Sequence, residues 1–68
     1  MDMRTYAIRD WDLNREIVIR QETGFKRAVE FFRETLGCPR QHAVHLAHMA
    51  VSCPDELREY GYDVIELP

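Results

Sequence analysis

Residues 38–54 read CPRQHAVHLAHMAVSCP, and this stretch carries the clearest indication of fold in the chain. Its small and apolar residues recur at the spacing of one helix side, while His42, His45 and His48 fall on the other side. Pro39 suits a first helical turn, where its missing N–H would have no partner. The stretch therefore predicts an amphipathic helix that packs one side against the rest of the protein.

Two segments earlier in the chain alternate apolar and polar residues, as strands with one wet face do. They are residues 5–12, TYAIRDWD, and residues 15–21, REIVIRQ. The segment that joins them, Asp12-Leu13-Asn14-Arg15, favours a turn, because Asp and Asn side chains bond their own backbone. We expect these two segments to form a β-hairpin.

A further helix is expected between Gly24 and Gly37. Apolar residues recur there at i, i+4, i+7 and i+11 from Phe25, which predicts one buried stripe. Phe31 lies off this stripe, and Gly37 suits the C-terminal cap. Large aromatic residues are enriched in interface hot spots, so we consider Phe31 a candidate contact, together with Trp11 near the hairpin tip.

The C-terminal residues add a short helical turn, PDELREY at residues 54–60, and a last strand, YDVIEL at residues 62–67. The sequence therefore predicts a small single α+β domain over residues 1–68, in which a β-hairpin is followed by two helices, a short helical turn and a C-terminal strand (ββααβ). We expect a three-stranded, mostly antiparallel sheet with the helices on one face.

Length and composition favour a folded domain that gains from a partner. The chain has 68 residues, of which 46% are hydrophobic and 31% charged, and a domain this small buries only about 60% of its unfolded surface. A homodimer is therefore an option. No apolar run approaches the ~20 residues of a membrane span, and the N-terminus lacks the pattern of a secretory signal. We expect a cytoplasmic protein with no membrane contact.

The net charge of −3 resides entirely in the second half of the chain. Residues 1–34 contain seven Lys or Arg and seven Asp or Glu, whereas residues 35–68 contain two and five. This distribution argues against a nucleic-acid partner, whose phosphates require clustered Lys and Arg, and favours a partner protein with a basic surface. The acidic candidates for that contact are Asp55, Glu56, Glu59, Asp63 and Glu66.

The histidines and cysteines suggest metal or nucleophile chemistry, but their pattern is weak. His45 and His48 could share a metal ion, yet the zinc-enzyme pattern H-E-x-x-H is absent and a strong site needs three or four convergent ligands. Cys38 and Cys53 bracket about 14 helical residues and so stand ~20 Å apart, which is too far for a disulfide. We therefore predict no metal, no cofactor and no enzymatic activity.

Residues 28–48 also fit a helix–turn–helix with a glycine in the turn, in which Arg40 and Gln41 would open the recognition helix. Against this interpretation, the usually small position five residues into the motif, after Ala28, is occupied by Arg33. Such helix pairs are also common in proteins that never touch DNA. A DNA-binding regulator is therefore the first alternative function, and a His-dependent metal-binding protein is the second.

The leading hypothesis is a small acidic, non-enzymatic protein–protein interaction module that acts as an inhibitor, adaptor or regulator. Small phage proteins that block nucleic-acid-handling complexes offer an analogy at the level of class. We expect binding through the polar side of the second helix and the acidic C-terminal segment. The candidate partner-binding residues are Trp11, Phe31, Gln41, His42, His45, His48, Met49, Asp55, Glu56, Glu59, Asp63 and Glu66.

Overall fold

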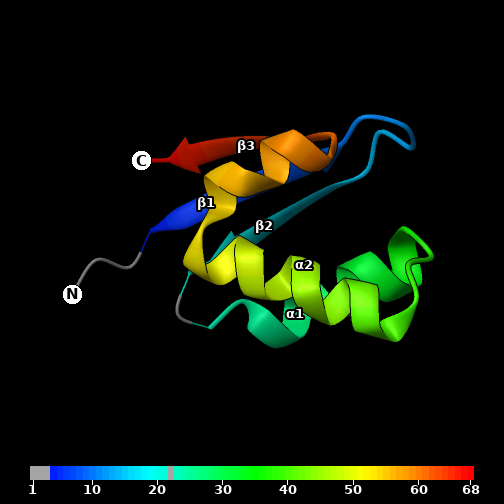
Figure 1. The fold of residues 1–68 in the computed structure, drawn as a ribbon. Coiled ribbons are helices and arrows are strands. Elements are labelled where there is room, and N and C mark those ends of the chain that lie inside the picture. Colours follow the sequence, from blue (N-terminus) through cyan, green and yellow to red (C-terminus); the bar gives the residue numbers. More distant parts are fainter. Residues whose placement is uncertain (1–3, 22) are drawn as a thin grey trace.

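The computed structural model describes residues 4–21 and 23–68, and Figure 1 shows a sheet with helices packed against it. The order of the elements confirms the predicted α+β class and ββααβ arrangement. The first predicted helix consists of an α-helix that passes into a π-helical turn (η1), and the short helical turn is a 3-10 helix (η2). The elements are β1 (Thr5–Asp10), β2 (Glu16–Arg20), α1 (Phe25–Glu30), η1 (Phe31–Thr35), α2 (Arg40–Ser52), η2 (Pro54–Tyr60) and β3 (Tyr62–Leu67).

β1 is the central strand of an antiparallel sheet with the order β2-β1-β3. Ile8 lies opposite Ile17 of β2 and Val64 of β3, and all three side chains are buried. Successive side chains of a strand point to opposite faces, so the alternate residues form a second face, which we name the open face. Val18 and Ile65 lie on it and are exposed. The helices therefore cover one face of the sheet, as predicted.

Turn chemistry closes the hairpin between β1 and β2. The N–H of Asp10 donates to the carbonyl oxygen of Arg15 at 2.8 Å, and its Oδ2 accepts a hydrogen bond from the N–H of Leu13 at 2.7 Å. Asn14 adopts a left-handed conformation with φ of 57°, which asparagine tolerates better than most residues. Asn14 thus acts as the turn residue that the sequence predicts, whereas the carboxylate that bonds the loop backbone is Asp10, because β1 ends two residues earlier than expected.

Small residues let α2 lie close to its neighbours in the core. Ala43, Ala47 and Ala50 are completely buried together with Leu46, and α2 contacts α1, η1 and η2. The preceding helical segment stops at Gly37, where φ of 74° favours glycine. The predicted amphipathic helix is therefore confirmed, with its small-residue side inward.

Gly24 brings the start of α1 against the end of β2. A Cβ atom at this position would lie 2.5 Å from the carbonyl oxygen of Arg20 and 2.8 Å from Cβ of Ile19. Real Cβ atoms do not approach backbone so closely, so glycine is the residue that permits this connection.

Phe32 joins the helical layer to the sheet. Its side chain is completely buried, and its ring packs edge-on against Phe31, with centroids 5.4 Å apart, and against Tyr62 of β3, at 5.5 Å. Leu57 of η2 closes the same core from the C-terminal side. Within the part of the chain that the structure describes, no helix has the length and apolar character that a membrane crossing requires.

Candidate functional site

The polar side of α2 is exposed, as predicted, but its residues do not form one cluster. With 3.6 residues per turn, Gln41, His45 and His48 share one ridge, whereas His42 falls toward the other margin of the exposed surface. The ring of His48 packs against Phe25 of α1, with centroids 4.6 Å apart and planes tilted by 44°. One histidine is therefore partly occupied in holding the helices together.

Two predicted contact residues, Phe31 and Met49, are buried and cannot meet a partner in this fold. The prediction assumed one narrow apolar stripe on a uniform α-helix, but Ala28, Phe31 and Phe32 are all buried, so the inward surface is wider. Met49 lies near the end of α2, from which the chain folds back as η2 to contact α2. Both corrections follow from tertiary packing rather than from local periodicity.

The acidic residues of η2 divide into a paired and an unpaired set. Asp55 Oδ1 accepts a hydrogen bond from Arg58 Nη1 at 2.7 Å, so its charge is partly neutralised. Residues three apart eclipse one another on a 3-10 helix, which places Glu56 and Glu59 on one side of η2. Both are exposed. Only these two carboxylates of η2 form a free acidic surface.

The remaining two acidic candidates lie elsewhere on the molecule. Asp63 is on the open face, opposite Arg9 in the sheet register. Glu66 Oε1 lies 3.5 Å from Arg4 Nη1, and both side chains are about half exposed. The predicted acidic face is therefore three separate surfaces, because a strand sends successive residues to opposite faces.

The two cysteines lie in different environments. Both are free, Cys53 at the surface and Cys38 half-buried. Burial, and secondarily the Asp10 carboxylate, raise the pKa of the Cys38 thiol, which keeps it protonated and weakly nucleophilic at neutral pH. Among residues 4–21 and 23–68, no three His, Cys, Asp or Glu side chains are placed to hold a metal ion together.

Three large exposed hydrophobic residues come from the hairpin loop and from the end of η2. The Trp11 N–H donates to the carbonyl oxygen of Gly61 at 3.4 Å, so the hairpin loop lies beside the connection from η2 to β3, as Figure 1 also shows. Trp11 is 62% exposed, Leu13 53% and Tyr60 51%. We name these three residues the end cluster. The sequence singled out Trp11, whereas Leu13 and Tyr60 join it only through the fold.

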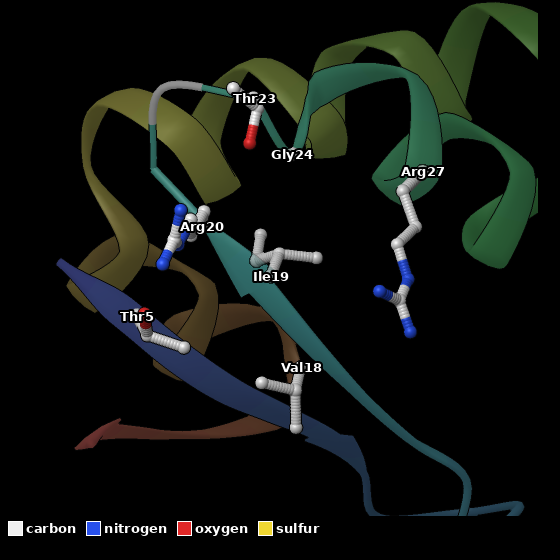
Figure 2. A pocket seen from close by; sticks show the side chains of 7 residues that line it. All are labelled: Thr5, Val18, Ile19, Arg20, Thr23, Gly24 and Arg27. Carbon is white, nitrogen blue, oxygen red and sulfur yellow. The ribbon is translucent and has the colours of Figure 1, made fainter. Parts of the chain in front are cut away.

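Two hollows follow the outer side of β2, and Figure 2 shows the first of them. It has a volume of about 460 Å³ and lies between β2 and the start of α1, with Gly24 at one end and Arg27 across from the strand. The second, of about 290 Å³, continues past Arg27 toward Glu16 and Ile17. The strand therefore borders open space along much of its length, although the start of α1 lies against its Arg20 end. The sequence could not indicate this.

The arrangement of α1 and α2 bears on the DNA-binding alternative. The two helices contact each other, and in Figure 1 they run side by side in opposite directions. A helix–turn–helix crosses its helices at about 90–120°, so this pair resembles a helical hairpin more closely. This geometry gives the DNA-binding alternative no specific support.

Comparison of the chain with models of protein families, with curated proteins and with solved structures finds no match in any of the three. The functional argument therefore rests on the residues of this chain alone.

Proposed function

We propose that the protein is a non-enzymatic protein–protein interaction module that acts as an inhibitor, adaptor or regulator of the protein that it binds. The observation that carries this proposal is the end cluster. Trp11 is 62% exposed, so its side chain adds little to the hydrophobic core of its own domain. Trp and Tyr are strongly enriched in binding hot spots.

The end cluster defines where the partner binds. Trp11 is the anchor, and Leu13 and Tyr60 extend its apolar surface. Charged groups adjoin this surface, because Glu59 immediately precedes Tyr60 and Asp63 lies two residues beyond Gly61, which Trp11 contacts. A partner with an apolar pocket and a basic rim suits this combination, since complementary charge steers encounter and selects among partners.

This proposal shifts the emphasis from α2 to the sheet end. The polar ridge of α2 offers hydrogen-bonding groups but no exposed large apolar side chain, because Met49 is buried. Hot spots are generally well-packed and desolvated, so the ridge is the weaker candidate. It remains a separate surface whose contribution the same experiment measures.

The test is quantitative capture from cell extract on the immobilised protein, with a matched pair of single variants. Trp11→Ala removes the anchor, and His45→Ala removes an exposed ring from α2. We expect Trp11→Ala to lower capture of a specific protein at least about tenfold, because loss of a hot spot costs ~2 kcal/mol of binding free energy. His45→Ala should leave the capture unchanged. Far-UV circular dichroism of both variants checks that the fold is retained.

Two outcomes would contradict the proposed surface. Capture that survives Trp11→Ala and falls with His45→Ala would move the binding site to α2. Capture that falls only when Glu56 and Glu59 are both changed to Lys would move it to η2. If no protein is enriched above an unrelated control domain, the interaction module itself is wrong.

A further inference from the structure

The two edges of the sheet differ in how they are protected. β2 and β3 are the outer strands. At the β3 edge, Nη2 of Arg58 donates to the carbonyl oxygen of Val64 at 2.6 Å, and η2 packs against the strand. The β2 edge is less covered. The start of α1 contacts its Arg20 end at Gly24, and two hollows lie along the strand, the first of which Figure 2 shows. Exposed edge strands invite pairing with another chain unless they are covered or charged.

The hydrogen bonds at the two ends of the hairpin determine which backbone groups of β2 point away from β1. Asp10 N–H donates to the carbonyl oxygen of Arg15 at 2.8 Å, and Gln21 N–H donates to that of Arg4 at 2.9 Å. In an antiparallel pair these groups alternate along the strand. The odd-numbered residues of β2 therefore bond to β1, and the N–H and C=O groups of the even-numbered residues point outward.

The outward residues are Glu16, Val18 and Arg20. Within the described residues, none of their outward backbone groups has a hydrogen-bond partner. Their side chains lie on the open face and are exposed. The edge carries no proline, and its two charges have opposite sign and stand at its two ends.

We infer that β2 pairs with β2 of a second copy in antiparallel orientation, which joins two sheets into one of six strands. A two-fold axis at Val18 sets the register, because it places Val18 opposite its own copy and Glu16 opposite Arg20 in both directions. All three outward residues then face outward residues, as antiparallel hydrogen bonding requires. The strand EIVIR is thus complementary to itself in both charge and bonding pattern.

The alternation of side chains between the two faces of the sheet is consistent with the same register. Ile17 lies opposite Ile19 of the second copy, so buried side chains stay on the covered face and open-face side chains stay on the open face. Gly24 lies against the Arg20 end of the edge, and its lack of a side chain leaves that end less obstructed. This pairing uses none of the end cluster, so it does not depend on the partner proposed above.

Charge reversal tests the register. Glu16→Arg places arginines opposite each other twice, and Arg20→Glu does the same with carboxylates, so each single variant raises the dissociation constant of the dimer about tenfold. The double variant E16R/R20E restores both pairs and with them the dimer. Analytical ultracentrifugation measures the constant, with a wild-type dimer expected at twice the 8.1 kDa of the chain.

Val18→Pro tests the edge itself. Its N–H points away from β1, so proline removes no bond of the hairpin but removes the central donor of both copies. We expect a folded monomer by circular dichroism and sedimentation. The charge-reversal set remains decisive if this variant does not fold.

Amide hydrogen exchange locates the contact in the wild-type protein. The amides of Glu16, Val18 and Arg20 should exchange more slowly as protein concentration rises, whereas exposed amides elsewhere should not change. A wild-type chain that remains monomeric at about 1 mM overturns the inference. A dimer in which these three amides exchange freely, or one that E16R/R20E fails to restore, overturns it equally.

Discussion

Alkaline pH should destabilise the protein through a single tyrosine. Tyr62 opens β3, is 7% exposed and packs its ring against Phe32. Burial is the main cause that raises its pKa from 10 to about 12, and the negative charges of three nearby groups add to it. These groups are Cys38, Asp10 and Asp12.

The sign of the effect follows from proton binding. The unfolded chain loses the Tyr62 proton near pH 10, while the folded protein keeps it until the pKa of about 12. Between these values the unfolded state binds fewer protons, so the free energy of unfolding falls as pH rises. The two-unit difference amounts to at most about 2.7 kcal/mol. That is a large part of the ~3–10 kcal/mol typical of a domain this size.

Urea unfolding followed by circular dichroism from about pH 9 to about pH 12 measures this loss. Tyr62→Phe has no phenol to ionise, so its stability should fall less over the same range. Ionisation of Cys38 also lowers the free energy of unfolding at alkaline pH, because its pKa is raised in the folded protein. Both proteins therefore carry Cys38→Ser in this comparison. The difference between the two curves should stay below the stated upper limit, because Cys38→Ser also removes one of the charges that raise the pKa of Tyr62. Parallel curves for the two proteins would refute the argument.

Three further changes test the packing. Phe32→Ala should lower the free energy of unfolding by about 3–5 kcal/mol in urea titrations, because it opens a cavity between η1 and β3. Gly24→Ala should lower the free energy of unfolding by at least ~1–3 kcal/mol, since its Cβ would stand 2.5 Å from the β2 backbone. The matched control Gly37→Ala meets no atom within 4 Å and should lower it by only about 1 kcal/mol, through the positive φ at that position. Arg58→Ala should cost about 1–2 kcal/mol and speed concentration-dependent aggregation, measured by light scattering, because it uncovers the Val64 carbonyl at the β3 edge.

Much of the fold follows from the positions of Gly and Pro and from the periodicity of the apolar residues. The last strand, Tyr62–Leu67, has the predicted bounds, because Gly61 stops the preceding turn with φ of 93°. The α2 helix begins at Arg40, and Pro39 is its N-cap residue rather than a residue of the first turn, so the proline indicates the helix start to within one residue. These sequence features act locally, and they determine the bounds of an element where no tertiary contact overrides them.

The candidate site was less predictable, because exposure depends on tertiary contacts. An ideal helical period places Phe31 off the buried stripe and makes it a candidate contact, but the segment becomes π-helical and its inward surface is wide enough to bury this residue. Met49 is covered although its position on α2 borders the polar side. Pairing of Asp55 with Arg58 removes part of an acidic surface that the linear sequence suggested.

The open β2 edge shows most clearly what sequence reasoning lacks. Ile17, Val18 and Ile19 form one apolar run, and alternation assigns their side chains to two faces. It does not say which strand is central and which is left at an edge. That depends on β3 returning beside β1, a pairing between opposite ends of the chain.

The two inferences together constrain how the protein would act. Antiparallel pairing at β2 sends the two hairpins to opposite ends of the six-stranded sheet, so the two end clusters point away from each other. A dimer of this kind binds two separate partner molecules. It does not bind one partner at two points, because the two end clusters would have to lie close enough for one molecule to reach both. Val18→Pro, which is expected to be a folded monomer, should therefore halve the mass of the assembly without changing the affinity of each Trp11 for its partner. An adaptor needs the bridge, whereas an inhibitor that blocks one surface does not, so the activity of that monomeric variant separates the two roles.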